Sequence, residues 1–371
     1  MHSCHSIGTA VDLGSTTIAV CVMDLEKESE ILSLSFPNPQ CIYGADVITR
    51  IRHCMENEEK EHIMNRLVRE SLWKELEDHL DEDCGCIEKM VISGNTTMLH
   101  ILTERPVSGM AAAPFKPESL EFETVSHNRP ICMGGGSYTE IYPPGISAFV
   151  GADILSGVSA LDMGKKDSYE LLVDLGTNGE MLLLNKKQGY ASSTACGPVF
   201  DHAVAGASYG SESIKAIANC VKRGLIDGNG TLREPFFDTG IEIDKGFVIT
   251  QTNVRNFQMA KAAIYAGIRC LMQKAAIKTE DIDRVYISGG LGFYMDIRDA
   301  VTVKMLPEDF TGKITVSGNT SLEGAKKLLL ASNEAKDAVL SEYEQIRKRT
   351  ESFNLADFAQ FQDIYLESIN M

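Results

Sequence analysis

The stretch LLVDLGTNGE, residues 171–180, combines an apolar run, an aspartate and a turn that contains two glycines. An apolar run resumes at residues 181–184, so the pattern predicts a strand, a tight turn and a second strand. Such a turn directs successive backbone N–H groups and the Thr177 hydroxyl toward one point, which suits a phosphate group. Asp174 precedes the turn, where a carboxylate can hold a phosphate-bound Mg²⁺. For this stretch alone, an ordinary hairpin with an Asn-Gly turn is the alternative.

A second copy of the pattern lies far upstream, at VDLGSTT, residues 11–17. Asp12 takes the place of Asp174, and an apolar run again follows the turn. A third glycine turn, SGGLG at residues 288–292, follows another predicted strand. The first two turns can hold the phosphates of ATP from opposite sides of a cleft. The glycines of the third leave no side chain between the backbone and an adenine or ribose face.

Length and composition limit the class of protein. A chain of 371 residues predicts two domains or one large bilobed unit. No apolar run has the length of a membrane span, and the N-terminus lacks the layout of a signal peptide, so we expect a soluble cytoplasmic protein. The net charge of −17 argues against nucleic acid or an anionic membrane as partner, and it leaves room for a basic protein.

The ten cysteines do not form a recognisable cluster motif. The sequence has neither a C-x-x-C pair nor a ferredoxin pattern, so most of the cysteines are expected to be small buried hydrophobic residues. Cys84 and Cys86 lie close together in an acidic loop and are the candidates for a metal or redox site.

Two further segments carry polar residues where a strand meets a helix. The strand at 89–93 runs into GNTTMLH, residues 94–100, where Asn95 and Thr96 either contact a ligand or cap the following helix. The second segment, VGAD at residues 150–153, precedes a helix rich in small residues that must pack closely on a neighbour. Other predicted elements are an amphipathic helix at 56–80, an extended loop at 104–138, a helix with one apolar face at 253–276 and a charged helix at 333–350.

The three turns resemble those of the sugar-kinase, actin and heat-shock ATPase (ASKHA) superfamily over nearly the whole chain. The resemblance implies an α/β, bilobed, actin-like (ribonuclease H-like) fold, with two duplicated mixed-sheet halves and a nucleotide cleft between them. It implies ATP and Mg²⁺ as cofactors, with the metal held by Asp12 and Asp174 through water. The matching nucleotide-binding residues are Gly14, Ser15, Thr16 and Thr17 in the first turn, Gly176, Thr177, Asn178 and Gly179 in the second, and Gly289, Gly290 and Gly292 in the third.

The same superfamily places an acidic residue before the second phosphate motif, where it acts as a base or positions water. Asp153 occupies that place in this sequence, so Asp153, Asp12 and Asp174 form the predicted catalytic set. A helix N-cap is the structural alternative for Asp153.

Longer segments resemble the reductive activators of corrinoid enzymes (RACE-type) in their C-terminal ATPase part. The segments are YGADVITR (43–50), GNTTMLH (94–100), PGISAFVGAD (144–153), VDLGTNGE (173–180), ACGPVF (195–200), TQTNVR (250–255), SGGLG (288–292) and GNTSL (318–322). The resemblance implies an ATPase that drives a low-potential electron onto Co(II) of an inactivated corrinoid protein and restores Co(I). The implied partner is a corrinoid protein or methyltransferase of methyl-transfer metabolism, and a homodimer stays open.

The sequence departs from this family in two places. Members normally carry an N-terminal ferredoxin-type [2Fe–2S] domain, whereas this sequence begins directly at the ATPase hairpin. We therefore expect no iron–sulfur cluster in this chain and a separate ferredoxin-like electron donor. The second departure is Phe200-Asp-His, where the family has Phe-Glu-Gly followed by a basic residue, so the family's contacts there are not expected.

The expected domains are a first ATPase lobe at 1–165 with an inserted loop region at about 104–140, a second lobe at 166–332, and a helical tail at 333–371 that packs on the lobes. Three alternative functions stay open. They are a small-molecule kinase of the same superfamily, a non-catalytic nucleotide-dependent interaction protein, and an activator of acyl-CoA dehydratases or reductases with a [4Fe–4S] cluster shared across a dimer.

Overall fold

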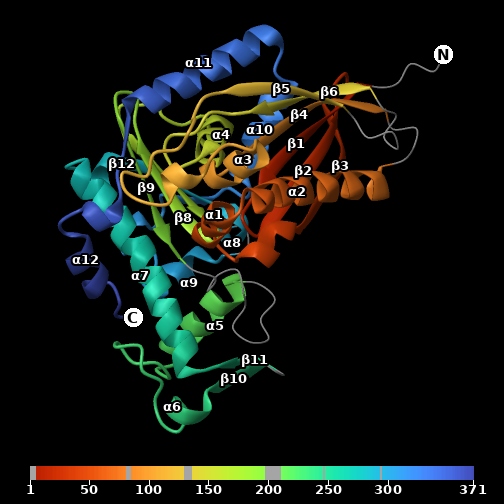
Figure 1. Cartoon of the computed structure of the whole chain (residues 1–371). Helices are drawn as coiled ribbons and strands as arrows, with labels where there is room; N and C mark the ends of the chain where they lie inside the picture. The colour runs from red at the N-terminus through yellow and green to blue at the C-terminus, as the bar shows by residue number, and fades with distance from the viewer. Residues whose placement is uncertain (1–5, 81–84, 129–135, 197–209, 245–246, 293–294) are drawn as a thin grey trace. The chain divides into compact units, whose positions relative to one another are not determined.

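The computed structural model describes residues 6–80, 85–128, 136–196, 210–244, 247–292 and 295–371 (Figure 1). The chain divides into two compact units. Unit 1 comprises Met1–Asp162 and Thr320–Arg349, and unit 2 comprises Met163–Asn319 and Thr350–Met371. Within the described residues, each unit contains a six-stranded mixed sheet, which confirms the predicted α/β class.

The sheet of unit 1 is built around the strand that ends in the first phosphate turn. Its strands are, in spatial order, β3 (Ser29–Pro37), β2 (Thr17–Asp24), β1 (Ser6–Leu13), β4 (Cys86–Gly94), β6 (Ser137–Tyr142) and β5 (Glu123–Asn128). Strand β1 pairs with β2 in the antiparallel direction and with β4 in the parallel direction. The aspartate at the end of β1 therefore lies between a hairpin partner and a parallel neighbour.

The described part of unit 1 also contains six α-helices: α1 (Val47–Glu56), α2 (Glu58–His79), α3 (Thr96–Leu102), α4 (Ala152–Leu161), α10 (Thr320–Leu330) and α11 (Asn333–Arg349). The small-residue helix α4 packs on α10, as its composition predicts. A Cβ atom added at Gly324 of α10 would lie 2.0 Å from the carbonyl oxygen of Ser156 on α4. The two helix backbones can approach this closely only because residue 324 is a glycine.

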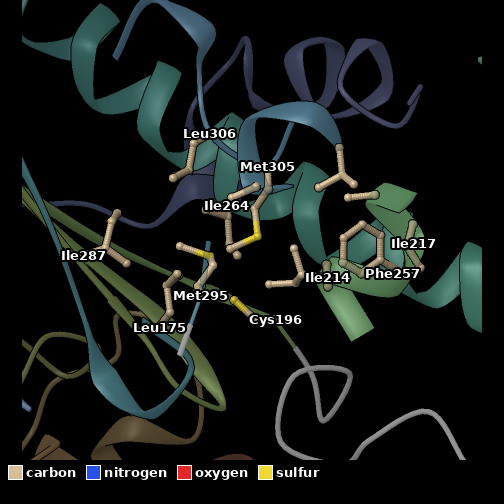
Figure 2. Packing of buried hydrophobic residues seen from close by; sticks show 14 of the residues in the cluster. Leu175, Cys196, Ile214, Ile217, Phe257, Ile264, Ile287, Met295, Met305 and Leu306 are labelled. Carbon is tan, nitrogen blue, oxygen red and sulfur yellow. The ribbon is translucent and has the colours of Figure 1, made fainter. Parts of the chain in front are cut away.

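The sheet of unit 2 has the strand order β13 (Ile314–Val316), β12 (Ile282–Ser288), β7 (Tyr169–Leu175), β8 (Asn178–Leu184), β9 (Gly189–Ala195) and β14 (Thr350–Ser352). The remaining elements of this unit include β10 (Ile241–Asp244), β11 (Phe247–Ile249), α5 (Gly210–Lys222), α6 (Phe236–Thr239), α7 (Gln251–Lys274), α8 (Gly289–Gly292), α9 (Ile297–Thr302) and α12 (Phe361–Glu367). Helix α7 confirms the helix predicted at 253–276. Its residues Phe257 and Ile264 pack with Leu175 of β7 and Ile287 of β12 in one apolar cluster (Figure 2).

The two sheets repeat one topology. The order β9-β8-β7-β12-β13 of unit 2 matches β3-β2-β1-β4-β6 of unit 1, with two antiparallel pairs followed by two parallel pairs in each. The strand registers also correspond, because Asp12 pairs with Ser93 in unit 1 and Asp174 pairs with Ser288 in unit 2. This equivalence confirms the predicted duplication of two mixed-sheet halves.

The prediction of an extended loop at 104–138 is wrong in part. Strand β5 lies within this segment, and it pairs with β6 in the antiparallel direction. Side chains of β5 alternate between half-buried and exposed and are mostly polar, so they lack the apolar signal of a strand. None of the helices that the structure describes is both long enough and apolar enough to cross a membrane.

Candidate functional site

Hydrogen bonds to its carbonyl groups hold the first phosphate turn, Gly14–Thr17, from one side. The side-chain amide of Asn38 donates to the carbonyl of Gly14, and its backbone N–H donates to that of Thr16, both at 2.8 Å. Arg50 donates through Nη2 to the carbonyl of Ser15 at 2.5 Å. A trans peptide places its N–H opposite its C=O. The N–H groups that follow these three carbonyls therefore point away from Asn38 and Arg50.

Arg50 is a fully buried cation in the part of the chain that the structure describes, with 0% of its surface exposed. It lies on α1, whose N-cap Asp46 accepts a hydrogen bond from the backbone N–H of Thr49. Besides its bond to the turn, Arg50 donates to the carbonyl of Gly44 at 3.1 Å. Burial lowers the pKa of Arg50. The segment YGADVITR thus supplies the residue that fixes the turn, a role that the sequence did not reveal.

The glycines of the two phosphate turns have different functions. A Cβ atom at Gly14 would lie 2.5 Å from the carbonyl oxygen of Thr17, so this position admits only glycine without a shift of the turn. A Cβ atom at Gly176 would meet no atom closer than 3.8 Å. At Gly179 it would lie 2.9 Å from the sulfur of Cys196 on the sequence that follows β9. Gly14 and Gly179 are therefore required for close packing, and Gly176 is not.

Asn95 both caps a helix and contacts the first phosphate turn. Its side-chain oxygen accepts from the backbone N–H of Met98 at 3.0 Å, which makes it the N-cap of α3. Its Nδ2 donates to the hydroxyl of Ser15 at 3.0 Å. Thr96 is buried, and its hydroxyl donates to the carbonyl of Ser147 at 2.6 Å. The structure therefore gives both residues a structural contact, and it brings Asn95 to the turn.

Asp153 is the second residue of α4, and the N-cap of this helix is Gly151. The interpretation of Asp153 as the N-cap is therefore wrong. One oxygen of the half-buried Asp153 carboxyl accepts from the backbone N–H of Ile154 at 2.8 Å. A Cβ atom at Gly151 would lie 2.6 Å from the Cα atom of Asn95. The start of α4 is thus packed directly against the residue that contacts the phosphate turn.

In unit 2, the glycine turn at residues 288–292 lies beside Asp174. Ser288 at the end of β12 donates from its hydroxyl to Oδ2 of Asp174 at 2.7 Å. Gly289 has a φ of +86°, and a Cβ atom there would lie 2.7 Å from Oδ1 of Asp174. Gly290 is exposed, with open space where its Cβ would be. The structure therefore brings Gly289 to the carboxylate, and it leaves an uncovered backbone surface at Gly290. Gly292 ends the short helix α8.

The aspartate of unit 1 has a serine partner as well. Ser321, near the start of α10, donates to Oδ1 of Asp12 at 2.8 Å. The two residues lie 309 positions apart in the sequence, so no local pattern indicates the contact. Asp12 and Asp174 are both half-buried at the ends of equivalent strands. A serine hydroxyl thus helps to fix the orientation of each carboxylate.

The residues at these two strand ends fit Mg²⁺ and phosphate groups. Carboxylates and hydroxyls are the hard oxygen ligands that Mg²⁺ prefers, and a turn of outward N–H groups suits an anion. Among the described residues, no group of three or more histidine, cysteine or acidic side chains could hold a metal ion without further ligands.

Most of the cysteines that the structure describes are buried thiols outside any disulfide, namely Cys21, Cys54, Cys196, Cys220 and Cys270, whereas the Cys41 thiol is exposed. This agrees with the prediction of small buried hydrophobic residues. Burial raises the pKa of Cys54 to about 12, so its thiol stays protonated and unreactive at neutral pH. Cys86 begins β4, whereas Cys84 and the departure at residues 200–202 lie outside the described residues.

Two protein-family models match the sequence. One is described as the RACo middle region and matches residues 7–166. The other is described as the C-terminal domain of RACo, the ASKHA domain, and matches residues 201–371. Together they support an actin-like ATPase fold for the chain.

Similar proteins carry names that refer to corrinoid activation. The corrinoid activation enzyme RamQ of Eubacterium limosum is 28% identical over 88% of this chain and 65% of its own length. The [Co(II) methylated amine-specific corrinoid protein] reductase of Methanosarcina barkeri is 24% identical over 90% of this chain and 71% of its own length. A solved reductive activator for corrinoid, iron–sulfur protein is 27% identical, has a TM-score of 0.85, and is matched over 100% of this chain and 67% of its own length. The chain thus spans about two thirds of the length of these relatives.

Proposed function

We propose that this chain, which belongs to the family of reductive activators of corrinoid proteins and matches their middle and ASKHA regions, couples ATP to the reduction of a corrinoid partner. The partner's cobalt is the substrate. One electron from a separate ferredoxin-like iron–sulfur donor converts its Co(II) to Co(I). The partner is a corrinoid protein or a methyltransferase that carries one, and the reaction takes place in the cytoplasm.

The nucleotide part of this proposal rests on the hydrogen bonds that Asn38 and Arg50 donate to the first phosphate turn. Asn38 and Arg50 engage three successive carbonyl groups on one side, at 2.5–2.8 Å. The N–H groups that follow are thereby directed to the other side, before any ligand is present. A preformed set of donors binds an anion without the entropic cost of ordering the loop.

Each candidate residue has a definite task in this proposal. Asp12 and Asp174 hold Mg²⁺ through water, and the turns Gly14–Thr17 and Gly176–Gly179 donate to phosphate oxygens. Gly290 offers its open backbone surface, with Gly289 and Gly292, to the adenosine. Asp153 orients or deprotonates the attacking water, and bound ATP with Mg²⁺ supplies the γ-phosphate whose hydrolysis changes the nucleotide state. Asn95 supports the first turn through Ser15.

Isothermal titration calorimetry tests the nucleotide site. The wild-type protein should bind ATP in the presence of Mg²⁺, and Asp12→Asn and Asp174→Asn should each weaken this binding strongly. Asp337→Asn, an exposed aspartate of α11, is the matched control and should bind as the wild type does. Normal ATP binding by both site variants would show that the site is assigned wrongly.

The fate of the γ-phosphate separates this function from that of a kinase. We expect release of inorganic phosphate to water, which a phosphate assay measures, and a strong loss of this rate in Asp153→Asn. Transfer of the phosphoryl group to a small molecule, with no phosphate released, would contradict the proposed activator function.

A further inference from the structure

Both candidate metal-binding aspartates accept a hydrogen bond from a serine, but the two serines come from different places. In unit 2, Ser288 stands beside Asp174 on the neighbouring parallel strand and donates to it directly. Ser93 occupies the equivalent position beside Asp12 in unit 1. There the donor to Asp12 is instead Ser321 of α10, and Ser93 contacts Ser321 at 3.1 Å. Unit 1 thus has an additional hydroxyl between the strand serine and the aspartate.

The row of hydroxyls continues from Ser93 to Ser156 on α4, at 2.9 Å. All three serines are buried, with exposed fractions of 2% for Ser321 and 0% for Ser93 and Ser156. Buried hydroxyls must satisfy their hydrogen-bonding groups within the protein. The row is therefore a fixed internal network that runs from Asp12 to the helix that carries Asp153.

Counting protons determines the direction of every bond in this row. An ionised carboxylate only accepts, so the single proton of Ser321 goes to Asp12. Ser321 must then accept at its second contact, which makes Ser93 the donor there. Ser93 has no further proton, so Ser156 donates to Ser93. All three O–H dipoles point toward Asp12, and such aligned bonds strengthen one another.

We propose that Ser321, supported by Ser93 and Ser156, is a positioning residue that holds the Asp12 carboxylate in the orientation that binds Mg²⁺. This inference rests on the proposed ATP and Mg²⁺ site. The contact of α4 and α10 at Gly324 fixes the distance between the helices that carry Ser156 and Ser321. The metal affinity of Asp12 therefore depends on the packing of these two helices, one of which also carries Asp153.

The test measures metal affinity separately from nucleotide affinity. Mn²⁺ replaces Mg²⁺, and electron paramagnetic resonance reports the fraction bound in the presence of saturating ATP. Ser321→Ala should weaken Mn²⁺ binding about 10-fold, because a misoriented Asp12 carboxylate no longer holds the metal-bound water, and losses of outer-shell contacts of a metal have effects of this size. ATP affinity without metal should stay unchanged. Ser321→Thr keeps the hydroxyl and should retain most of the metal affinity.

Thr320→Val is the matched control in the same turn of α10. Its hydroxyl is buried and makes no hydrogen bond within the part of the chain that the structure describes. This isosteric variant should bind Mn²⁺ and ATP as the wild type does. Thermal unfolding of the ligand-free proteins shows whether each variant is folded. Should Ser321→Ala not fold, Ser156→Ala takes its place, with the same selective loss of Mn²⁺ affinity expected at a smaller size.

The outcomes separate this inference from the proposed function. Unchanged Mn²⁺ affinity in a folded Ser321→Ala protein, beside a strong loss in Asp12→Asn, would overturn the inference alone. An equal loss of metal affinity and metal-free ATP affinity would also overturn it, because Ser321 would then act through the fold. A wild-type protein without metal-dependent ATP binding would overturn the proposed function as well.

Discussion

The substitutions Gly14→Ala and Gly176→Ala should have opposite effects, although the two glycines occupy matching places in the two phosphate turns. The Cβ atom added by Gly14→Ala would lie 2.5 Å from the carbonyl oxygen of Thr17, a backbone atom that cannot move without the turn. Overpacking of this kind costs about 1–3 kcal/mol. For domains of this size, that corresponds to a fall of about 2–12 °C in the melting temperature.

At Gly176 the same change should be harmless or slightly stabilising. Its nearest neighbour would be 3.8 Å from the new Cβ atom, and its φ lies outside the left-handed region. Alanine there restricts the unfolded chain, which stabilises a folded protein by about 0.4–1 kcal/mol. Differential scanning calorimetry of both ligand-free variants measures the difference. Equal melting temperatures for the two variants would refute the turn geometry described above.

Four further substitutions, one of them a control, test other parts of the structure. Gly324→Ala should destabilise by about 1–3 kcal/mol in denaturant unfolding. Gly267→Ala in α7 should not, because its Cβ atom would meet the flexible end of Met181 and, at an ordinary contact distance of 3.4 Å, Leu355. Arg50→Lys should weaken ATP binding about 10-fold in calorimetry, because an ammonium cannot replace the guanidinium fork that holds the turn. Burial, and then the charge of Lys304, lowers the pKa of Lys261 to about 7. Between pH 7 and about 10, the Lys261 amine is protonated in the unfolded chain but not in the folded protein. The free energy of unfolding of the wild type, measured with urea, should therefore rise over that range, and Lys261→Met should lack this rise.

Elements with strong local patterns could be predicted from the sequence. The hairpin that carries Asp12 appears where the glycine turn and its apolar run place it, and the helix α7 appears where the apolar face at 253–276 predicts it. Strand β14 could not be predicted, since its three residues gain their strand conformation only by pairing with β9 in the same unit. Strand β5 was missed because its side chains are mostly polar.

The candidate site likewise has parts that local sequence predicts and parts that only the tertiary fold brings together. The positions of Asp12 and Asp174 at strand ends follow from local sequence, and the structure confirms that these two strands hold equivalent places in the two sheets. The groups that hold them could not be predicted. Arg50 reaches Ser15 across 35 positions and Ser321 reaches Asp12 across 309, so only the tertiary fold brings these pairs together. Serine and arginine are also common enough that their presence alone indicates no partner.

The most direct test of the proposed activator is the absorbance of a Co(II) corrinoid protein under anaerobic conditions. A reduced ferredoxin supplies the electron, and the spectrum reports the formation of Co(I). The proposed function predicts that Co(I) forms only when the wild-type chain and ATP with Mg²⁺ are both present, and that Asp12→Asn and Asp174→Asn abolish it. Formation of Co(I) at the same rate without ATP, or without the chain, would contradict the proposal.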